Sequence, residues 1–143
     1  MSKTVKRILV GVLICASGLW QVSPTYAAKA KIYNLNITSN QKTIKVHVGD
    51  FLNLKLESTY WNIEPLTSQK ISQLSDPAIT PIAPGPSASA GCQLPGSGCG
   101  TIIWKLKALK KGSAQIKANR TSCGEALKCS PQDAIYNVQV KII

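Results

Sequence analysis

The residues of this chain that can carry acid, base or nucleophilic chemistry are few and far apart. His47 is the only histidine, and the alternation of its strand places it on the polar side, so a Ser-His-Asp or Cys-His site would need it to turn inward. The six carboxylates are scattered, with Glu57 and Glu64 near predicted strand ends and no pair spaced for general acid and base catalysis. The glycines at 96 to 100 lead into a strand, whereas a phosphate-binding loop leads into a helix. These observations predict that the protein is not an enzyme.

The cysteines are the other reactive groups, and four of the five lie in two close pairs. Cys92 is near Cys99, and Cys123 is near Cys129. Neither spacing supplies the Cys-x-x-Cys pairs of a structural zinc site, so we predict no metal and no cofactor. In an oxidising compartment an even number of cysteines favours two disulfides, each stabilising a small loop by roughly 2 to 3 kcal/mol. Local pairing is expected, but crossed bridges such as Cys92 to Cys123 remain open if the two loops converge.

The first residues of the chain have the pattern of an export signal. Three basic residues precede an apolar stretch from Ile8 to Trp20, and a small-residue site ends at Ala27. The pattern predicts a bacterial-type signal peptide at residues 1–27 and a secreted or periplasmic mature protein with no transmembrane span. An uncleaved membrane anchor is the alternative, but an apolar run of about 13 residues is short for a bilayer.

Basic residues outnumber acidic ones in the mature chain. Cleavage leaves 14 of the 17 Lys and Arg residues against 6 Asp and Glu residues, a net charge near +8. This balance attracts anionic partners, and nucleic acid is not expected outside the cytoplasm. Lys105, Lys107, Lys117 and Lys141 are spread singly along alternating strands, which is typical of a solvated sheet face.

Hydrophobic residues alternate with a period of two from Lys31 onward, and no helix is predicted. About seven short strands therefore predict an all-β sandwich in one domain, residues 28–143. Residues 65–100 are rich in Pro, Gly and Ser and predict a long irregular excursion, with a short strand at Ala78 to Ile82. The inward-facing residues are expected to be Tyr33, Leu35, Ile37, Ile44, Val46, Val48, Leu52, Leu54, Leu56, Ile102, Trp104, Leu106, Ala108, Ala114, Ile116, Ala118, Tyr136, Val138, Val140 and Ile142.

Three loops stand out between the strands: Ser58 to Trp61, Gly96 to Gly100, and Arg120 to Cys129. With these loops, the sequence from about Lys42 to Ile143 resembles the chagasin-type inhibitors of papain-like cysteine proteases. The resemblance rests on the two strands and Val-Gly-Asp turn of Val46 to Leu56, on Trp61, on the glycine cluster, on the Leu109-Lys110-Lys111-Gly112 turn and on the strand Ile135 to Ile142.

The resemblance implies an immunoglobulin-like β-sandwich whose three loops fill the active-site cleft of a protease. The protease-contacting residues that it implies are Ser58, Thr59 and Tyr60, then Gly96, Ser97, Gly98 and Gly100 of a Gly-x-Gly-Gly-like loop, and Arg120 of an Arg-Pro-Trp-like loop. Thr121 and Ser122 replace the proline and the aromatic residue of that third loop, and Glu57 to Tyr60 is shorter than the family's Asn-Pro-Thr-Thr-Gly wedge. These departures predict a weaker affinity than that of well-matched members.

The leading hypothesis is a monomeric secreted or periplasmic inhibitor of a papain-like cysteine protease, which acts by reversible occlusion. Glycines are expected to leave the main chain of the middle loop uncovered for close approach to a cleft. The sharp turns of a disulfide-closed loop explain these glycines equally well. The alternative interpretation of Arg120 is a solvated loop cation, and that of Trp61 is a core tryptophan on a central strand. The alternative function is a non-enzymatic, envelope-associated structural or adhesive domain that meets anionic surface polymers.

Overall fold

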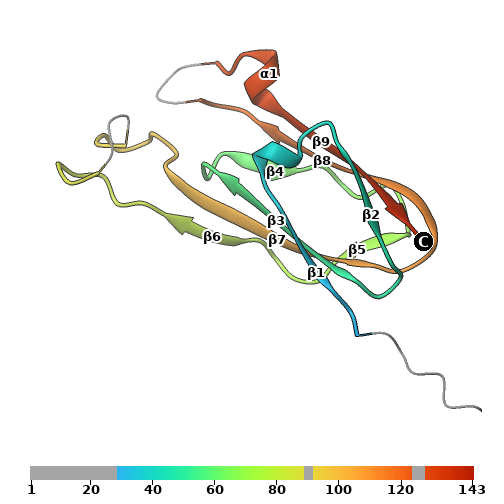
Figure 1. Cartoon of the computed structure of the whole chain (residues 1–143). Coiled ribbons are helices and arrows are strands. Elements are labelled where there is room, and N and C mark those ends of the chain that lie inside the picture. The colour runs from blue at the N-terminus through green and yellow to red at the C-terminus, as the bar shows by residue number, and fades with distance from the viewer. Residues whose placement is uncertain (1–28, 89–91, 124–127) are drawn as a thin grey trace, which may run out of the picture.

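Two β-sheets face each other across one hydrophobic core (Figure 1). The structure is a computed structural model that describes residues 29–88, 92–123 and 128–143, so the expected signal peptide lies outside the described residues. One sheet has the order β1 (Ile32–Leu35), β3 (Phe51–Glu57), β7 (Gly100–Ala108), β5 (Ile71–Gln73), with β6 (Ala78–Pro81) also paired to β7. The other has the order β2 (Thr43–Val46), β9 (Ile135–Ile142), β8 (Gly112–Arg120), β4 (Trp61–Ile63). The immunoglobulin-like sandwich expected from the sequence is confirmed.

Alternating residues of the long strands form the core, as the period of two predicts. Every residue predicted to face inward on β3, β7, β8 and β9 is buried, including Trp104 at 1% exposure. Of the remaining predicted core residues, Tyr33 and Ile44 are only partly buried against the core. Ile37 and Val48 are exposed: Ile37 is 53% exposed because it begins the 3-10 helix η1 (Ile37–Ser39), and Val48 is 46% exposed because β2 ends at Val46. Among the described residues, the buried core cluster runs from Leu35 to Ile142 and includes residues of both sheets.

The segment at 65–100 is less irregular than its composition predicts. Ile71 of β5 is 3% exposed and pairs with Ala108, so the first part of the segment extends the sheet. The expected short strand at 78–82 is confirmed as β6, which lies antiparallel to the first residues of β7. Among the described residues between β6 and β7, residues 82–88 and 92–99 belong to no helix or strand.

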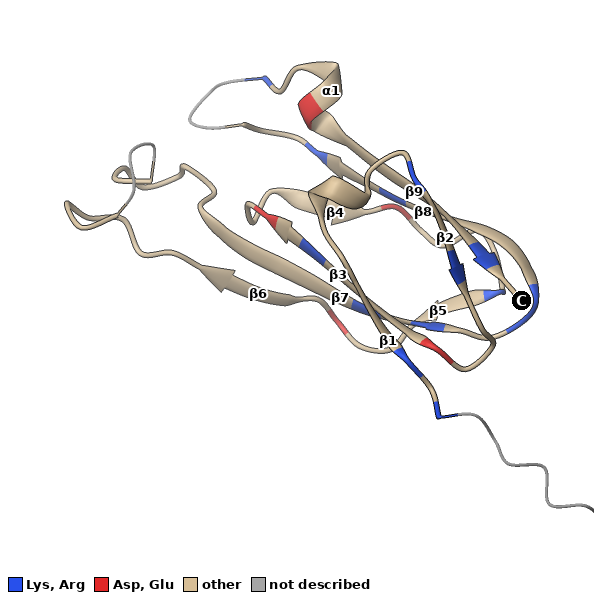
Figure 2. Ribbon diagram, in the orientation of Figure 1, with Lys and Arg blue, Asp and Glu red and all other residues tan. Residues whose placement is uncertain are grey.

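The strand directions place all three distinctive loops at one end of the sandwich. Residues 58–60 and the described residues 82–88, 92–99, 121–123 and 128–130 lie there, and we call this the loop end (Figure 1). The turns at 47–50 and 109–111, the start of β1 and residue 143 lie at the opposite end, which we call the basic end for its lysines (Figures 1 and 2). The short helix α1 (Pro131–Ala134), absent from the prediction, leads the chain from the loop end into β9.

Candidate functional site

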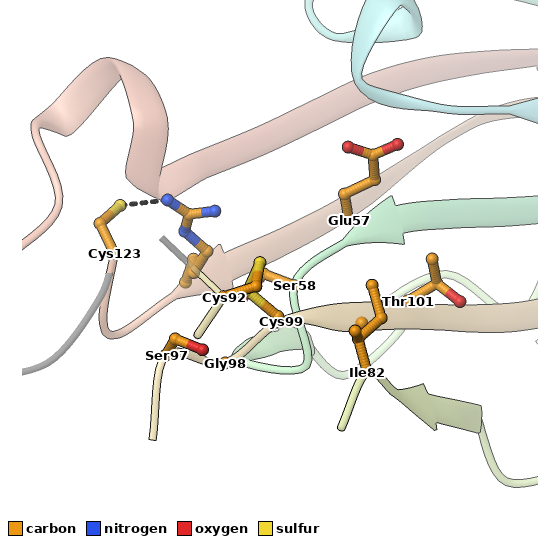
Figure 3. Close-up of a pocket in the computed structure, with 11 residues that line it drawn as sticks. Glu57, Ser58, Ile82, Cys92, Ser97, Gly98, Cys99, Thr101 and Cys123 are labelled. Atoms are coloured by element: carbon orange, nitrogen blue, oxygen red, sulfur yellow. Dashed lines mark hydrogen bonds between the residues drawn. A yellow bond between two sulfur atoms is a disulfide. The ribbon is translucent and has the colours of Figure 1, made fainter. Parts of the chain in front are cut away.

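A hollow of about 430 Å³ opens between the three loops (Figure 3). Ser58 comes from the loop after β3, Ser97 from the glycine cluster, and Cys123 from the loop after β8, and all three side chains line it. Segments that are far apart in the sequence therefore meet at one surface. The full lining is Glu57, Ser58, Ile82, Cys92, Ser97, Gly98, Cys99, Gly100, Thr101, Arg120 and Cys123.

Main-chain hydrogen bonds join the first loop to the second. The amide of Ser58 donates to the carbonyl of Gly100 at 2.8 Å, and the amide of Thr59 donates to the carbonyl of Gly98 at 2.8 Å. The hydroxyl of Tyr60 donates to the carbonyl of Gly96. Three alternate carbonyls of the glycine cluster thus accept hydrogen bonds from three successive residues of the first loop. The two loops form one braced unit, even though about forty residues separate them in sequence.

Gly98 has no side chain because the ring of Tyr60 occupies that space. A Cβ at Gly98 would lie 2.9 Å from Cγ of Tyr60 and closer still to Cδ2 and Cε2. The backbone at Gly98 also has φ +67°, in the left-handed region that favours glycine. At Gly100, with φ +139°, a Cβ would lie 2.8 Å from Cα of Pro81 and 2.9 Å from Cγ2 of Thr59.

These contacts correct the expectation that the glycine cluster leaves its main chain uncovered. The carbonyls of Gly96, Gly98 and Gly100 are engaged within the molecule, and Tyr60 covers Gly98. Sharp turning and close packing therefore account for these glycines, as one of the two sequence interpretations held. The pairing of Tyr60 with Gly98 was not predicted from the sequence, in which an aromatic residue in one loop and a glycine in another were the only signals of it.

The third loop is held by Arg120, the last residue of β8. Its guanidinium carbon lies 5.6 Å from the centroid of the Trp61 ring, and Arg120 is the register partner of Trp61. Its Nε donates to Sγ of Cys129 at 3.4 Å, and its Nη2 donates to Sγ of Cys123. Arg120 is half-buried and is therefore not the solvated loop cation of the alternative interpretation.

Trp61 is a core residue, as expected, but it lies on the edge strand β4 rather than on a central strand. It is 3% exposed, and its indole Nε1 donates to the carbonyl of Glu57 at 3.0 Å. This bond fixes the point where the chain crosses from one sheet to the other. The first loop accordingly starts from a rigid position, and Ser58 takes φ +97° to make the turn.

Two disulfides close the second and third loops, with the local pairing that the sequence favours. Cys92 is bonded to Cys99 with a Cα–Cα distance of 5.7 Å, and Cys123 is bonded to Cys129 with a Cα–Cα distance of 4.9 Å. Both bridges lie at the loop end. Crossed bridges are excluded by this pairing.

All eight residues that the resemblance implied as contacts are brought to the loop end. All eight border the hollow or its rim. Six of them also carry the hydrogen bonds that brace the first two loops, namely Ser58, Thr59, Tyr60, Gly96, Gly98 and Gly100. Two large apolar side chains that the sequence analysis did not single out are also exposed at this end, Leu94 at 62% and Ile82 at 51%. They offer apolar surface to a partner.

The hollow has hydroxyl groups but no histidine to activate them. His47 lies at the basic end, where Nδ1 is 3.7 Å from Oδ2 of Asp50. Within the described part of the chain, no group of three or more His, Cys, Asp or Glu is placed to hold a metal ion. No helix in those same residues is long and apolar enough to span a membrane. The side chains that line the hollow offer hydroxyl groups, the charged groups of Glu57 and Arg120, and the apolar surface of Ile82.

The fold also occurs in solved structures of other proteins. The cysteine protease inhibitor EhICP2 from Entamoeba histolytica matches with a TM-score of 0.57 at 18% sequence identity, over 82% of this chain and 100% of its own. Amebosin matches with a TM-score of 0.51 at 14% identity, over 80% of this chain and 99% of its own. No model of a known protein family matches the chain, and no curated protein matches its sequence. At these identities the likeness establishes the fold, which is the one that the sequence resemblance implied.

Proposed function

We propose that this chain is an exported, non-enzymatic inhibitor of papain-like cysteine proteases that occludes the active-site cleft with its loop end. The observation that carries the proposal is the braced set of three loops at one end of a sandwich, in a fold shared with the inhibitor EhICP2. A cleft is a concave site, and preformed loops that project from one end of the sandwich can enter it.

The bracing supports tight binding because it reduces the entropy lost on association. Immobilising a flexible side chain or loop residue on binding costs about 0.5 to 1.5 kcal/mol each. The first two loops are already joined by main-chain hydrogen bonds, and the second and third are closed by disulfides. These restraints reduce the ordering that remains to be done on binding.

The same bracing supports inhibition rather than cleavage. A protease must convert the scissile carbonyl into a tetrahedral oxyanion, which requires the carbonyl to leave its ground-state partners. The carbonyls of Gly96, Gly98 and Gly100 hold hydrogen bonds from the first loop, so their peptide units resist that distortion. The Cys92–Cys99 bridge also holds together the ends of a cut made between Cys92 and Cys99, which includes the peptide bonds after Gly96 and Gly98.

Leu94 is the residue that we expect to supply apolar contact with the protease. At 62% exposure it stands out from the loop end, and burying a leucine side chain stabilises a complex by roughly 1.5 to 3 kcal/mol. Ser97 and the hydroxyl-bearing rim of the hollow offer polar contacts beside it.

The test is a titration of the chain from residue 28 onward against papain and several related proteases. We expect reversible, stoichiometric inhibition without cleavage of the chain. Leu94→Asp is expected to weaken inhibition at least tenfold, whereas Leu74→Asp, at a position 47% exposed and away from the loop end, leaves it unchanged. Absence of inhibition at micromolar concentration across the panel, or equal effects of the two variants, overturns the proposal.

A further inference from the structure

Lysines gather at the end of the sandwich that lies opposite the loops (Figure 2). They come from the start of the described chain, the turns, and the adjoining strand ends, and they are Lys29, Lys31, Lys45, Lys70, Lys107, Lys110, Lys111 and Lys141. Lys45 and Lys141 are register partners on β2 and β9, and Lys110 and Lys111 are consecutive in the turn after β7. Like charges placed this close repel one another, and an anionic partner relieves that repulsion.

Acidic groups in the described residues do little to offset these lysines. Asp50 is the carboxylate at this end, and it is 3% exposed. Its Oδ1 accepts from the amide of Lys31 at 2.9 Å, and its Oδ2 accepts from the amide of His47 at 2.7 Å. Because its charge is directed at the main chain, the outer surface of this end stays positive.

Exposed apolar side chains lie among the lysines. Ile32 is 64% exposed, Val48 is 46% exposed and Leu109 is 40% exposed. The turns that carry Val48 and Leu109 adjoin each other, since the amide of Gly49 donates to the carbonyl of Ala108 at 2.8 Å. Apolar tips ringed by lysines are the combination that binds a lipid interface, where acyl chains accept the tips and anionic headgroups accept the charges.

We propose that the basic end docks on an anionic lipid bilayer, with Val48 and Leu109 at the interface and the surrounding lysines on headgroups. A soluble polyanion would engage the lysines but would leave the apolar tips in water, so the lipid surface is the better match. The loop end then points away from the membrane, toward proteins in solution (Figure 1). The proposal concerns a surface separate from the loops and holds whether or not the loops inhibit a protease.

The docking depends on charge and apolar contact, not on one particular headgroup. A hollow of about 170 Å³ at this end is lined by Lys29, Lys31, His47, Val48 and Asp50. The carboxylate of Asp50 in that lining opposes a bound phosphate. The affinity should therefore follow the surface charge of the membrane rather than the identity of the anionic lipid.

Vesicle sedimentation tests the proposal with the chain from residue 28 onward. We expect binding to phosphatidylcholine vesicles that contain about 30 mol % phosphatidylglycerol, and no binding to pure phosphatidylcholine, at about 0.1 M salt. Phosphatidylserine in place of phosphatidylglycerol should give the same affinity. Replacing Lys110, Lys111 and Lys141 by Gln should weaken binding roughly fivefold per lysine, on the order of 100-fold in total.

Matched variants separate a located surface from general positive charge. Replacing Lys55, Lys117 and Lys128 by Gln removes the same charge elsewhere and should weaken binding less than about fivefold. Lys55 and Lys117 lie about 13 Å or more along the strands from the nearest lysines of the basic end, beyond a screening length of about 8 Å, and Lys128 lies in the third loop, at the loop end. Val48→Ser with Leu109→Ser should weaken binding about tenfold, whereas Ile79→Ser with Leu94→Ser should not. The proposal is overturned if the two triple lysine variants lose the same affinity for the vesicles. It is also overturned if the Val48 and Leu109 variant binds as tightly as the wild type, since the surface would then bind polyanions through charge alone.

Discussion

At the scale of single residues, the loop end is organised by the fit of Tyr60 onto Gly98. The ring lies where a side chain at 98 would be, and the hydroxyl continues to the carbonyl of Gly96. A bulky residue at 98 would therefore displace the first loop as well as alter the second. Any loss of inhibition from such a variant reports on the shape of the whole loop end, so the contribution of the ring has to be measured separately.

A double-mutant cycle separates the steric contact from the backbone effect. Gly98→Ala places a Cβ against the ring and in a left-handed conformation, which costs about 1 to 2 kcal/mol for the backbone alone. In a Tyr60→Ala background the steric part disappears, so the cost of Gly98→Ala should fall toward the backbone value. Urea denaturation of the four proteins measures both costs. Identical costs in the two backgrounds would show that the ring does not occupy the space at Gly98.

Asp50 is the residue whose ionisation we expect to govern stability in acid. The amide of Lys31 and the amide of His47 donate to its carboxylate, and these bonds outweigh the opposing effect of burial and hold its pKa below the ordinary value. A lowered pKa means that the stabilisation is present at neutral pH, above the unfolded pKa of about 3.9, and is lost as pH falls through the lower folded pKa.

Asp50→Ala should lower the free energy of unfolding at pH 7 by about 2 to 3 kcal/mol, since it removes hydrogen bonds to a charged group. The exposed Asp76→Ala serves as the control and should have little effect. Denaturation curves from pH 7 to pH 2 should show the difference between wild type and Asp50→Ala shrinking below about pH 4. A difference that stays constant over that range would contradict the assignment.

At the scale of elements, alternation predicted the long strands because each buries one whole face. It missed β5, whose three residues bury only Ile71, and α1, which is a single turn. It misplaced Ile37 and Val48 because both continue an apolar alternation past the point where tertiary pairing stops. The candidate site was predicted as three loops, but their mutual bonds were not, since nothing local in a sequence encodes contacts between residues 58–60 and 96–100.

The two disulfides restrain the second and third loops. Cys92→Ser with Cys99→Ser should lower the free energy of unfolding by about 2 to 3 kcal/mol, because the unfolded chain gains entropy without the bridge. The double variant should also weaken inhibition, because the glycine cluster would then be held only by its hydrogen bonds to the first loop. Thermal denaturation and inhibition constants measure the two effects. The matched variant is Cys123→Ser with Cys129→Ser, in the third loop. Unchanged inhibition in both variants would show that the bridges do not contribute to the binding conformation.

At the scale of the whole molecule, the two ends carry different chemistry. One end presents braced loops with exposed Leu94 and Ile82, and the other presents lysines around exposed Val48 and Leu109. The positive charge and the turns are evident from the sequence. The lysines were nevertheless predicted to lie on solvated sheet faces, because a sequence does not show which strand ends lie together in space. The segregation to one end follows from the sandwich topology alone.

Occlusion of the cleft is the central claim, and binding to a protease whose cleft is already filled tests it most directly. Isothermal titration should compare three forms of papain: unmodified, S-methylated at the catalytic cysteine, and modified there by a covalent peptidyl ligand that fills the cleft. We predict comparable affinity for the first two forms, because binding involves no covalent step, and loss of binding to the third. Equal affinity for the filled and the unmodified protease would contradict the account and place the contact outside the cleft.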